Sequence, residues 1–182
     1  MHDLAPAEDA TAMSETLIEL CRHNAWANEQ VFDACEGLSD AQLDAAIPGT
    51  FGSIRNTLMH IAGAQGRFAA ALGETGPVEV ICERGPFPGL AELRDCARTS
   101  GDVLIEVAVR AQSGATVTTT WLGEAYSLPG WMLLAQALIH AAEHRTQVAV
   151  ILTQQGVESP AIDVWSYHED RFGADWSRLW SS

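Results

Sequence analysis

The sequence predicts an all-α protein whose helices form a four-helix bundle. Four segments of roughly 20 residues carry apolar side chains at intervals of three and four residues, the period of a helix with one buried face. Two connections between these segments are long, which allows neighbouring helices to run parallel. The composition agrees, because 47% of the residues are hydrophobic and that supplies enough apolar mass for a core.

The four predicted helices span residues 14–35, 53–72, 90–111 and 130–155. Ser14 is a suitable N-cap for the first helix. Gly37, Gly73 and Gly156 follow the ends of the first, second and fourth helices. The flanking residues therefore agree with the boundaries that the apolar periodicity indicates.

The rest of the chain predicts connections and a tail. Residues 73–89 contain three prolines and predict a long loop between the second and third helices. The β-branched and aromatic run within 117–128 predicts a short β excursion before the fourth helix. The aromatic C-terminal tail, about 159–182, is expected to pack across the bundle of about 14–155. Without repeats or low-complexity runs, residues 1–182 are predicted to form a single domain.

The charge balance argues against several kinds of partner. The chain has 24 acidic and 10 basic residues, a formal net charge of −14, and the basic residues are scattered. Such a surface repels phosphate backbones and anionic membranes. The longest apolar run, Leu133–Ala142, is too short to span a bilayer, and the N-terminus lacks the pattern of a signal peptide. We therefore expect a cytoplasmic protein that binds neither nucleic acid nor membrane.

Histidines are the strongest candidates for chemistry. His140 and His144 are four residues apart on the fourth helix, so both imidazoles lie on the same face and can share a metal ion. A hydrogen-bonded structural pair is the alternative. His60, in the middle of the second helix, is the candidate third ligand. Three imidazoles would leave a position for water, as in catalytic sites, and they suit zinc, nickel or iron about equally.

Other catalytic motifs are absent. The zinc-protease pattern HExxH fails because Ala141 follows His140, and no histidine has the preceding Glu of a di-iron bundle. The sequence contains neither Gly-x-Ser-x-Gly nor a glycine-rich phosphate loop. None of its four cysteines has CxxC spacing, which argues against a thiolate zinc site.

Four segments of the chain are similar to short motifs that occur together in one protein superfamily. Residues 140–148, HAAEHRTQV, resemble the motif NHxxxHRGQ, and residues 58–62, LMHIA, resemble LxHI. Residues 23–28, HNAWAN, are similar to YNxWAN, and residues 37–43, GLSDAQL, to GLSDEQL. With these four segments in the right order, the chain resembles the DinB-like (DNA-damage-inducible) superfamily over about residues 14–155.

The resemblance implies a bundle of DinB-like type, with parallel pairs of helices and a divalent metal held by His60, His140 and His144. It further implies a metal-dependent hydrolase or thiol S-transferase that acts on a small molecule, in some members together with a low-molecular-weight thiol. Many members form homodimers, so a homodimer is expected here.

The sequence departs from the superfamily pattern around these ligands. Gln65 replaces a frequent Glu, Thr146 a Gly, Gln136 a His and His23 a Tyr. These departures spare the three candidate ligands, but they affect the residues that would surround the substrate.

Two functions remain open at this stage. In the first, a metal-bound water or thiol attacks a small electrophilic molecule. In the second, the protein is a non-enzymatic metal-binding homodimer of the stress response, and a bundle without metal is a third possibility. Glu143 points ~100° around the helix from His144, which disfavours a general-base role. Arg145 and Gln147 could orient the ligands or face solvent or a partner, and His23 could line a pocket or lie on the surface.

Overall fold

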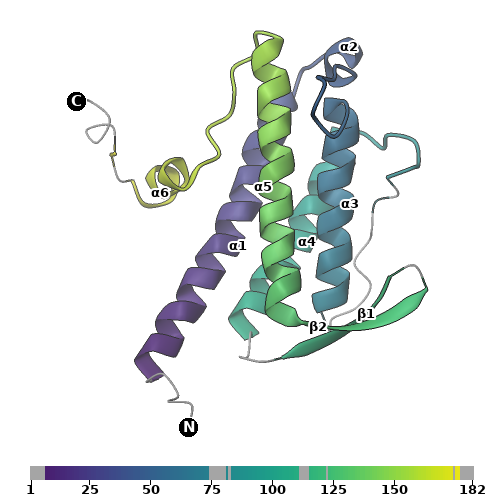
Figure 1. Cartoon of the computed structure of the whole chain (residues 1–182). Helices are drawn as coiled ribbons and strands as arrows, with labels where there is room; N and C mark the ends of the chain where they lie inside the picture. The colour runs from purple at the N-terminus through teal and green to yellow at the C-terminus, as the bar shows by residue number, and fades with distance from the viewer. Residues whose placement is uncertain are drawn as a thin grey trace.

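A computed structural model describes residues 7–73, 81, 83–110, 115–121, 123–173 and 175–176, and it is predominantly helical (Figure 1). The helices are α1 (Ala7–Cys35), α2 (Asp40–Leu43), α3 (Ile54–Leu72), α4 (Leu90–Arg110), α5 (Gly130–Gln154) and α6 (Val164–Phe172). The two strands are β1 (Thr116–Trp121) and β2 (Glu124–Pro129). The prediction of an all-α fold with a small β excursion is confirmed at this level.

The four long helices pack in a ring, in which α1 and α3 each contact both α4 and α5 (Figure 1). Leu93, near the start of α4, shares a core cluster with Ile54 at the start of α3. Leu104, near the end of α4, shares a second cluster with Ala69 near the end of α3. Helices α3 and α4 therefore run in the same direction. Residues 74–80 and 82 of the predicted loop between them lie outside the described residues.

The apolar core is divided along the helix axes. One cluster lies around the starts of α3 and α4, and the other lies toward the hairpin. Between them, each long helix contributes buried polar side chains, which we call the polar layer: Asn24, Asn28, Gln65, Ser100 and Arg145. The candidate metal ligands lie at this same level on α3 and α5.

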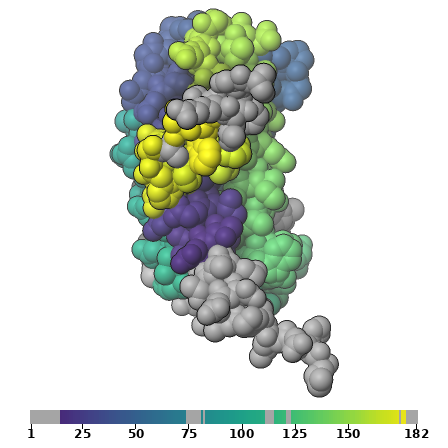
Figure 2. Space-filling model, turned by 90° about the vertical axis from the view of Figure 1, so that its left-hand side faces the viewer, coloured from purple at the N-terminus to yellow at the C-terminus, as the bar shows by residue number. Residues whose placement is uncertain are grey.

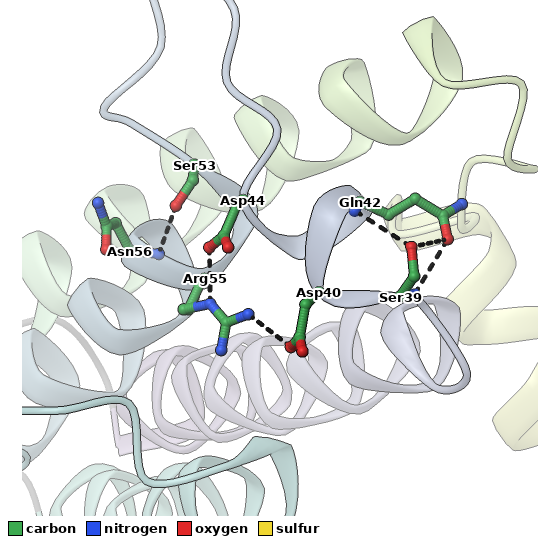
Figure 3. Close-up of polar contacts among 7 residues, drawn as sticks. All are labelled: Ser39, Asp40, Gln42, Asp44, Ser53, Arg55 and Asn56. Atoms are coloured by element: carbon green, nitrogen blue, oxygen red, sulfur yellow. Dashed lines mark hydrogen bonds and ion pairs between the residues drawn. The ribbon is translucent and has the colours of Figure 1, made fainter.

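A side-chain cap marks the start of α3, and two ion pairs join α3 to α2 (Figure 3). The Ser53 Oγ accepts a hydrogen bond from the backbone N–H of Asn56. Arg55 joins the two helices through Nη2 to Asp40 (2.9 Å) and Nε to Asp44 (2.8 Å). These contacts fix the segment that leads into His60.

Two short helices were not predicted. Helix α2 is capped by Ser39, which forms a capping box with Gln42, and this Ser-x-x-Gln spacing is a recognised helix start (Figure 3). Helix α6 is capped by Asp163, whose side chain accepts hydrogen bonds from two backbone N–H groups. In addition, α1 starts at Ala7 rather than near Ser14.

The described part of the aromatic tail packs against α1, and Figure 2 shows α6 on that face of the molecule. Tyr167 is buried there, and its hydroxyl donates to Glu19 at 2.7 Å. The Trp26 indole donates to Asp170 at 2.8 Å. Residues 177–182 of the tail lie outside the described residues.

The hairpin pairs β1 with β2 in antiparallel register, from Thr116 opposite Pro129 to Trp121 opposite Glu124. The hairpin begins one residue before and ends one residue after the predicted run of 117–128. None of the described helices combines the length and the apolar character needed to cross a bilayer.

Candidate metal centre

The fold brings His60 of α3 together with His140 and His144 of α5. Their ring centroids are separated by 4.8 Å (His60 to His140), 4.7 Å (His60 to His144) and 4.5 Å (His140 to His144). One potential ligand atom from each lies within 4.8 Å of the other two. The group could therefore hold one metal ion, with three protein ligands and room for a further ligand.

The ring of His60 is held by a carboxylate. Its Nδ1 lies 2.5 Å from Oε2 of Glu83, and the other oxygen of Glu83 pairs with Arg67. Burial opposes ionisation of Glu83, but hydrogen bonds from His60 and Arg67 outweigh it and lower the pKa of this carboxyl. An ionised Glu83 accepts the Nδ1 proton of His60 and leaves Nε2 as the atom that can bind a metal.

The ring of His144 is held by an amide. Its Nδ1 lies 3.0 Å from Oε1 of Gln147, and the same oxygen accepts the backbone N–H of Phe51 at 3.0 Å. Because Oε1 can only accept, Nδ1 of His144 carries the proton and Nε2 is free. Gln147 therefore orients the ring of His144, one of the alternatives that the sequence left open for this residue.

His140 differs from the other two because neither of its ring nitrogens has a hydrogen-bond partner among the described residues. Burial, followed by the nearby His144 and His60, lowers the pKa of His140 to about 4. Burial also lowers the pKa of His144. These two imidazoles are therefore neutral at pH 7, the form that coordinates a metal.

Two phenylalanines enclose the histidines. The ring of Phe51 stacks on His60 at 4.0 Å and meets His144 edge-on at 5.2 Å, while Phe68 lies 6.2 Å from His140. His60 and His140 are partly exposed, and Phe51 is 49% exposed. His60 and His140 are therefore not completely shielded from solvent.

Arg145, the residue after His144, is directed into the polar layer and is only 2% exposed. Its Nη1 donates to Oδ1 of Asn24 (2.7 Å) and Oδ1 of Asn28 (2.8 Å), and both of these amides donate to Gln65. Burial lowers the pKa of Arg145 to about 10, so it stays charged at pH 7. It makes no ion pair with a described carboxylate, and its Nε has no partner there.

The other residues singled out from the sequence lie away from the centre or do not contact the ligands. His23 lies against the tail, where its Nε2 is 3.0 Å from the carbonyl of Ile162. Glu143 and Gln136 are exposed on α5, and the Thr146 hydroxyl donates to a carbonyl of its own helix.

Sequence reasoning missed Glu83 and Phe51, the two contacts that loops bring to the site. Both lie outside the periodic segments, so helical spacing carries no information about them. The only feature of the sequence that singled out Glu83 was its own acidic side chain in a predicted loop with three prolines.

A model of the DinB family matches residues 13–175. The chain belongs to the DinB family. The match includes all four long helices from residue 13 onward and all three histidines, so this is a DinB-family protein with a group that could hold a metal ion. Among curated proteins, none matches this DinB-family chain.

Proposed function

We propose that this DinB-family protein is a metal-dependent enzyme that uses His60, His140 and His144 as the ligands of a divalent ion. The observation that carries the proposal is the hydrogen bonding behind the ligands: acceptors on Nδ1 of His60 and His144 leave Nε2 of both rings available. A structural histidine pair would instead have both nitrogens satisfied by protein groups. The nitrogen-rich donor set suits zinc, nickel or iron.

The chemistry proposed is hydrolase or thiol S-transferase chemistry on a small molecule. A bound metal would lower the pKa of a water, or hold a small thiol as thiolate. The described thiols of Cys21 and Cys35 are buried, and burial raises their pKa to about 11 and about 12. They are therefore poor nucleophiles, and in this proposal the nucleophile comes from solution.

The protein's own residues would orient and enclose the reactants. Glu83 and Gln147 hold two imidazoles in place, and Phe51 offers a half-exposed apolar ring stacked on His60. We propose further that the four long helices form a bundle of DinB type. The protein would act as a cytoplasmic homodimer, without nucleic-acid or membrane partners.

The metal site is tested by comparing the wild type with a variant in which all three histidines are replaced by alanine. Both proteins are dialysed against a weak chelator, because an acidic surface holds cations loosely, and their metal content is then measured. We expect about one equivalent of metal in the wild type and a trace in the variant. Equal metal content in the two proteins would refute the site.

The enzyme proposal needs a separate test. Metal-loaded wild type is screened with electrophilic small molecules, in water alone and with low-molecular-weight thiols, alongside the triple variant. Turnover by the wild type alone supports an enzyme. Bound metal without turnover in any pairing would favour the non-enzymatic stress-response homodimer.

A further inference from the structure

Glu83 lies across one face of α3. His60, Gly63 and Arg67 are three and four residues apart, so they lie in a row along that face. The two carboxylate oxygens of Glu83 contact the ends of this row, Oε2 at Nδ1 of His60 (2.5 Å) and Oε1 at Arg67. One side chain thus joins a metal-ligand candidate to a cation two turns further along the helix.

Glycine in the middle of the row leaves the space that Glu83 occupies in this contact. A Cβ placed on Gly63 would lie 2.9 Å from both Cγ and Oε1 of Glu83, and 3.1 Å from the carbonyl oxygen of Ile81. Ile81 is itself buried in the core cluster, which keeps its carbonyl close to α3. Gly63, in the interior of α3, is costly for a helix, and the space it leaves is occupied by Glu83.

We propose that Glu83 is a positioning residue of the metal centre, admitted to His60 by the missing side chain of Gly63. It accepts the Nδ1 proton of His60, fixes the ring's orientation and leaves Nε2 for the metal. The inference rests on the proposed metal site but concerns a residue outside the three ligands. Removing such a partner typically costs about 10- to 100-fold in metal affinity.

Two other roles for Glu83 make different predictions. If Glu83 acted only as a negative charge near the ion, Glu143 would matter equally, because its charge also acts on His140 and His144. If Glu83 only fastened its loop to α3, the loss of Arg67 would have the same effect as the loss of Glu83. The variants E143A and R67M are therefore matched controls for E83A.

The first measurement is zinc affinity, by competition with a chromophoric chelator, for proteins that are folded by circular dichroism. We expect E83A to bind zinc about 10- to 100-fold more weakly than the wild type, and E143A and R67M to stay within about threefold. G63A retains the carboxylate but obstructs its approach, so its affinity should fall toward that of E83A. Wild-type affinity in E83A, or an equal loss in E143A or R67M, would overturn the proposal.

The second measurement uses metal-free protein. Nitrogen-15 NMR at about pH 9, where free imidazole is neutral, reports which ring nitrogen of His60 carries the proton. We expect the Nδ1-protonated tautomer in the wild type and a mixture in E83A. An unchanged tautomer in E83A would overturn the inference. If the wild type binds no zinc, the metal site is refuted, and the tautomer still decides whether Glu83 orients His60.

Discussion

Replacing Gln65 with leucine removes four hydrogen bonds from the polar layer and changes the volume of the side chain little. Oε1 of Gln65 accepts from Nδ2 of Asn24 (2.9 Å) and Nδ2 of Asn28 (3.0 Å). Its Nε2 donates to the carbonyl of Ala97 (2.7 Å) and to Oγ of Ser100 (2.8 Å). This side chain therefore links α1, α3 and α4, and through the two asparagines it reaches Arg145 on α5.

Two independent estimates give the loss in the free energy of unfolding that this replacement causes. Four hydrogen bonds at a net value of about 1 kcal/mol each give about 4 kcal/mol. Alternatively, the amides of Asn24 and Asn28 each keep a buried N–H without an acceptor, at about 1–3 kcal/mol apiece, which brackets the same value. For a protein of this size, a loss of about 4 kcal/mol lowers the melting temperature by roughly 8–16 °C.

The assay is urea unfolding followed by far-ultraviolet circular dichroism, with chelator present so that metal binding does not contribute. Gln136→Leu is the matched control, because Gln136 is exposed on α5 and the same chemical change there should alter stability by less than about 0.5 kcal/mol. If Gln65→Leu destabilised the protein by less than about 1 kcal/mol, the polar layer would not stabilise the fold as argued.

Two further predictions concern pH and the tail. Burial raises the pKa of Cys21 to about 11 and of Cys35 to about 12, above the ordinary thiol value of 9.0, so the unfolded chain releases these protons first. The contribution of these thiols to stability should be intact below about pH 9 and be lost as the pH rises toward 12. The measurement is the urea concentration at the unfolding midpoint as a function of pH. Its decline should be shallower in a variant with both cysteines replaced by alanine. Tyr167→Phe loses the hydrogen bond to Glu19 and should lower the free energy of unfolding in urea by about 1 kcal/mol. Tyr126→Phe, on the exposed hairpin, should not change it measurably. Equal effects of the two substitutions would contradict the docking of α6 through Tyr167.

The long helices could be predicted from sequence because helical periodicity is a local property. The same spacing placed His140 and His144 on one face, but it could not show that His60 reaches them. That proximity depends on the pairing of α3 with α5. The sequence offered His60 only as a candidate third ligand, from its place in the middle of a predicted helix and from the family resemblance. Glu83 and Phe51 were harder still to predict, because only the tertiary fold brings these loop residues to the site.

Arg145 and Gln65 illustrate a different limit. The sequence left Arg145 free to face solvent, and only the three-dimensional arrangement shows two asparagine oxygens meeting its guanidinium. At position 65 the resemblance suggested glutamate, yet here the side chain donates from Nε2 to the Ala97 carbonyl. A carboxylate would place an acceptor against that carbonyl, so the amide suits this interior. With the amide, Arg145 has no ion-pair partner among the residues that the structure describes.

The polar layer also restricts how the helices can slide past one another. A one-turn slip of α5, about 5.4 Å, would bring Ala141 or Ala149 to the level of the asparagines and leave Arg145 buried among apolar groups. The same slip would carry His144 away from His60, because His144 and Arg145 are adjacent in the chain. Apolar contacts can re-form after such a slip, whereas a buried cation that has lost its hydrogen-bond acceptors raises the free energy of the slipped state. The helix register that gives Arg145 its hydrogen-bond acceptors is therefore also the register that brings His144 to His60.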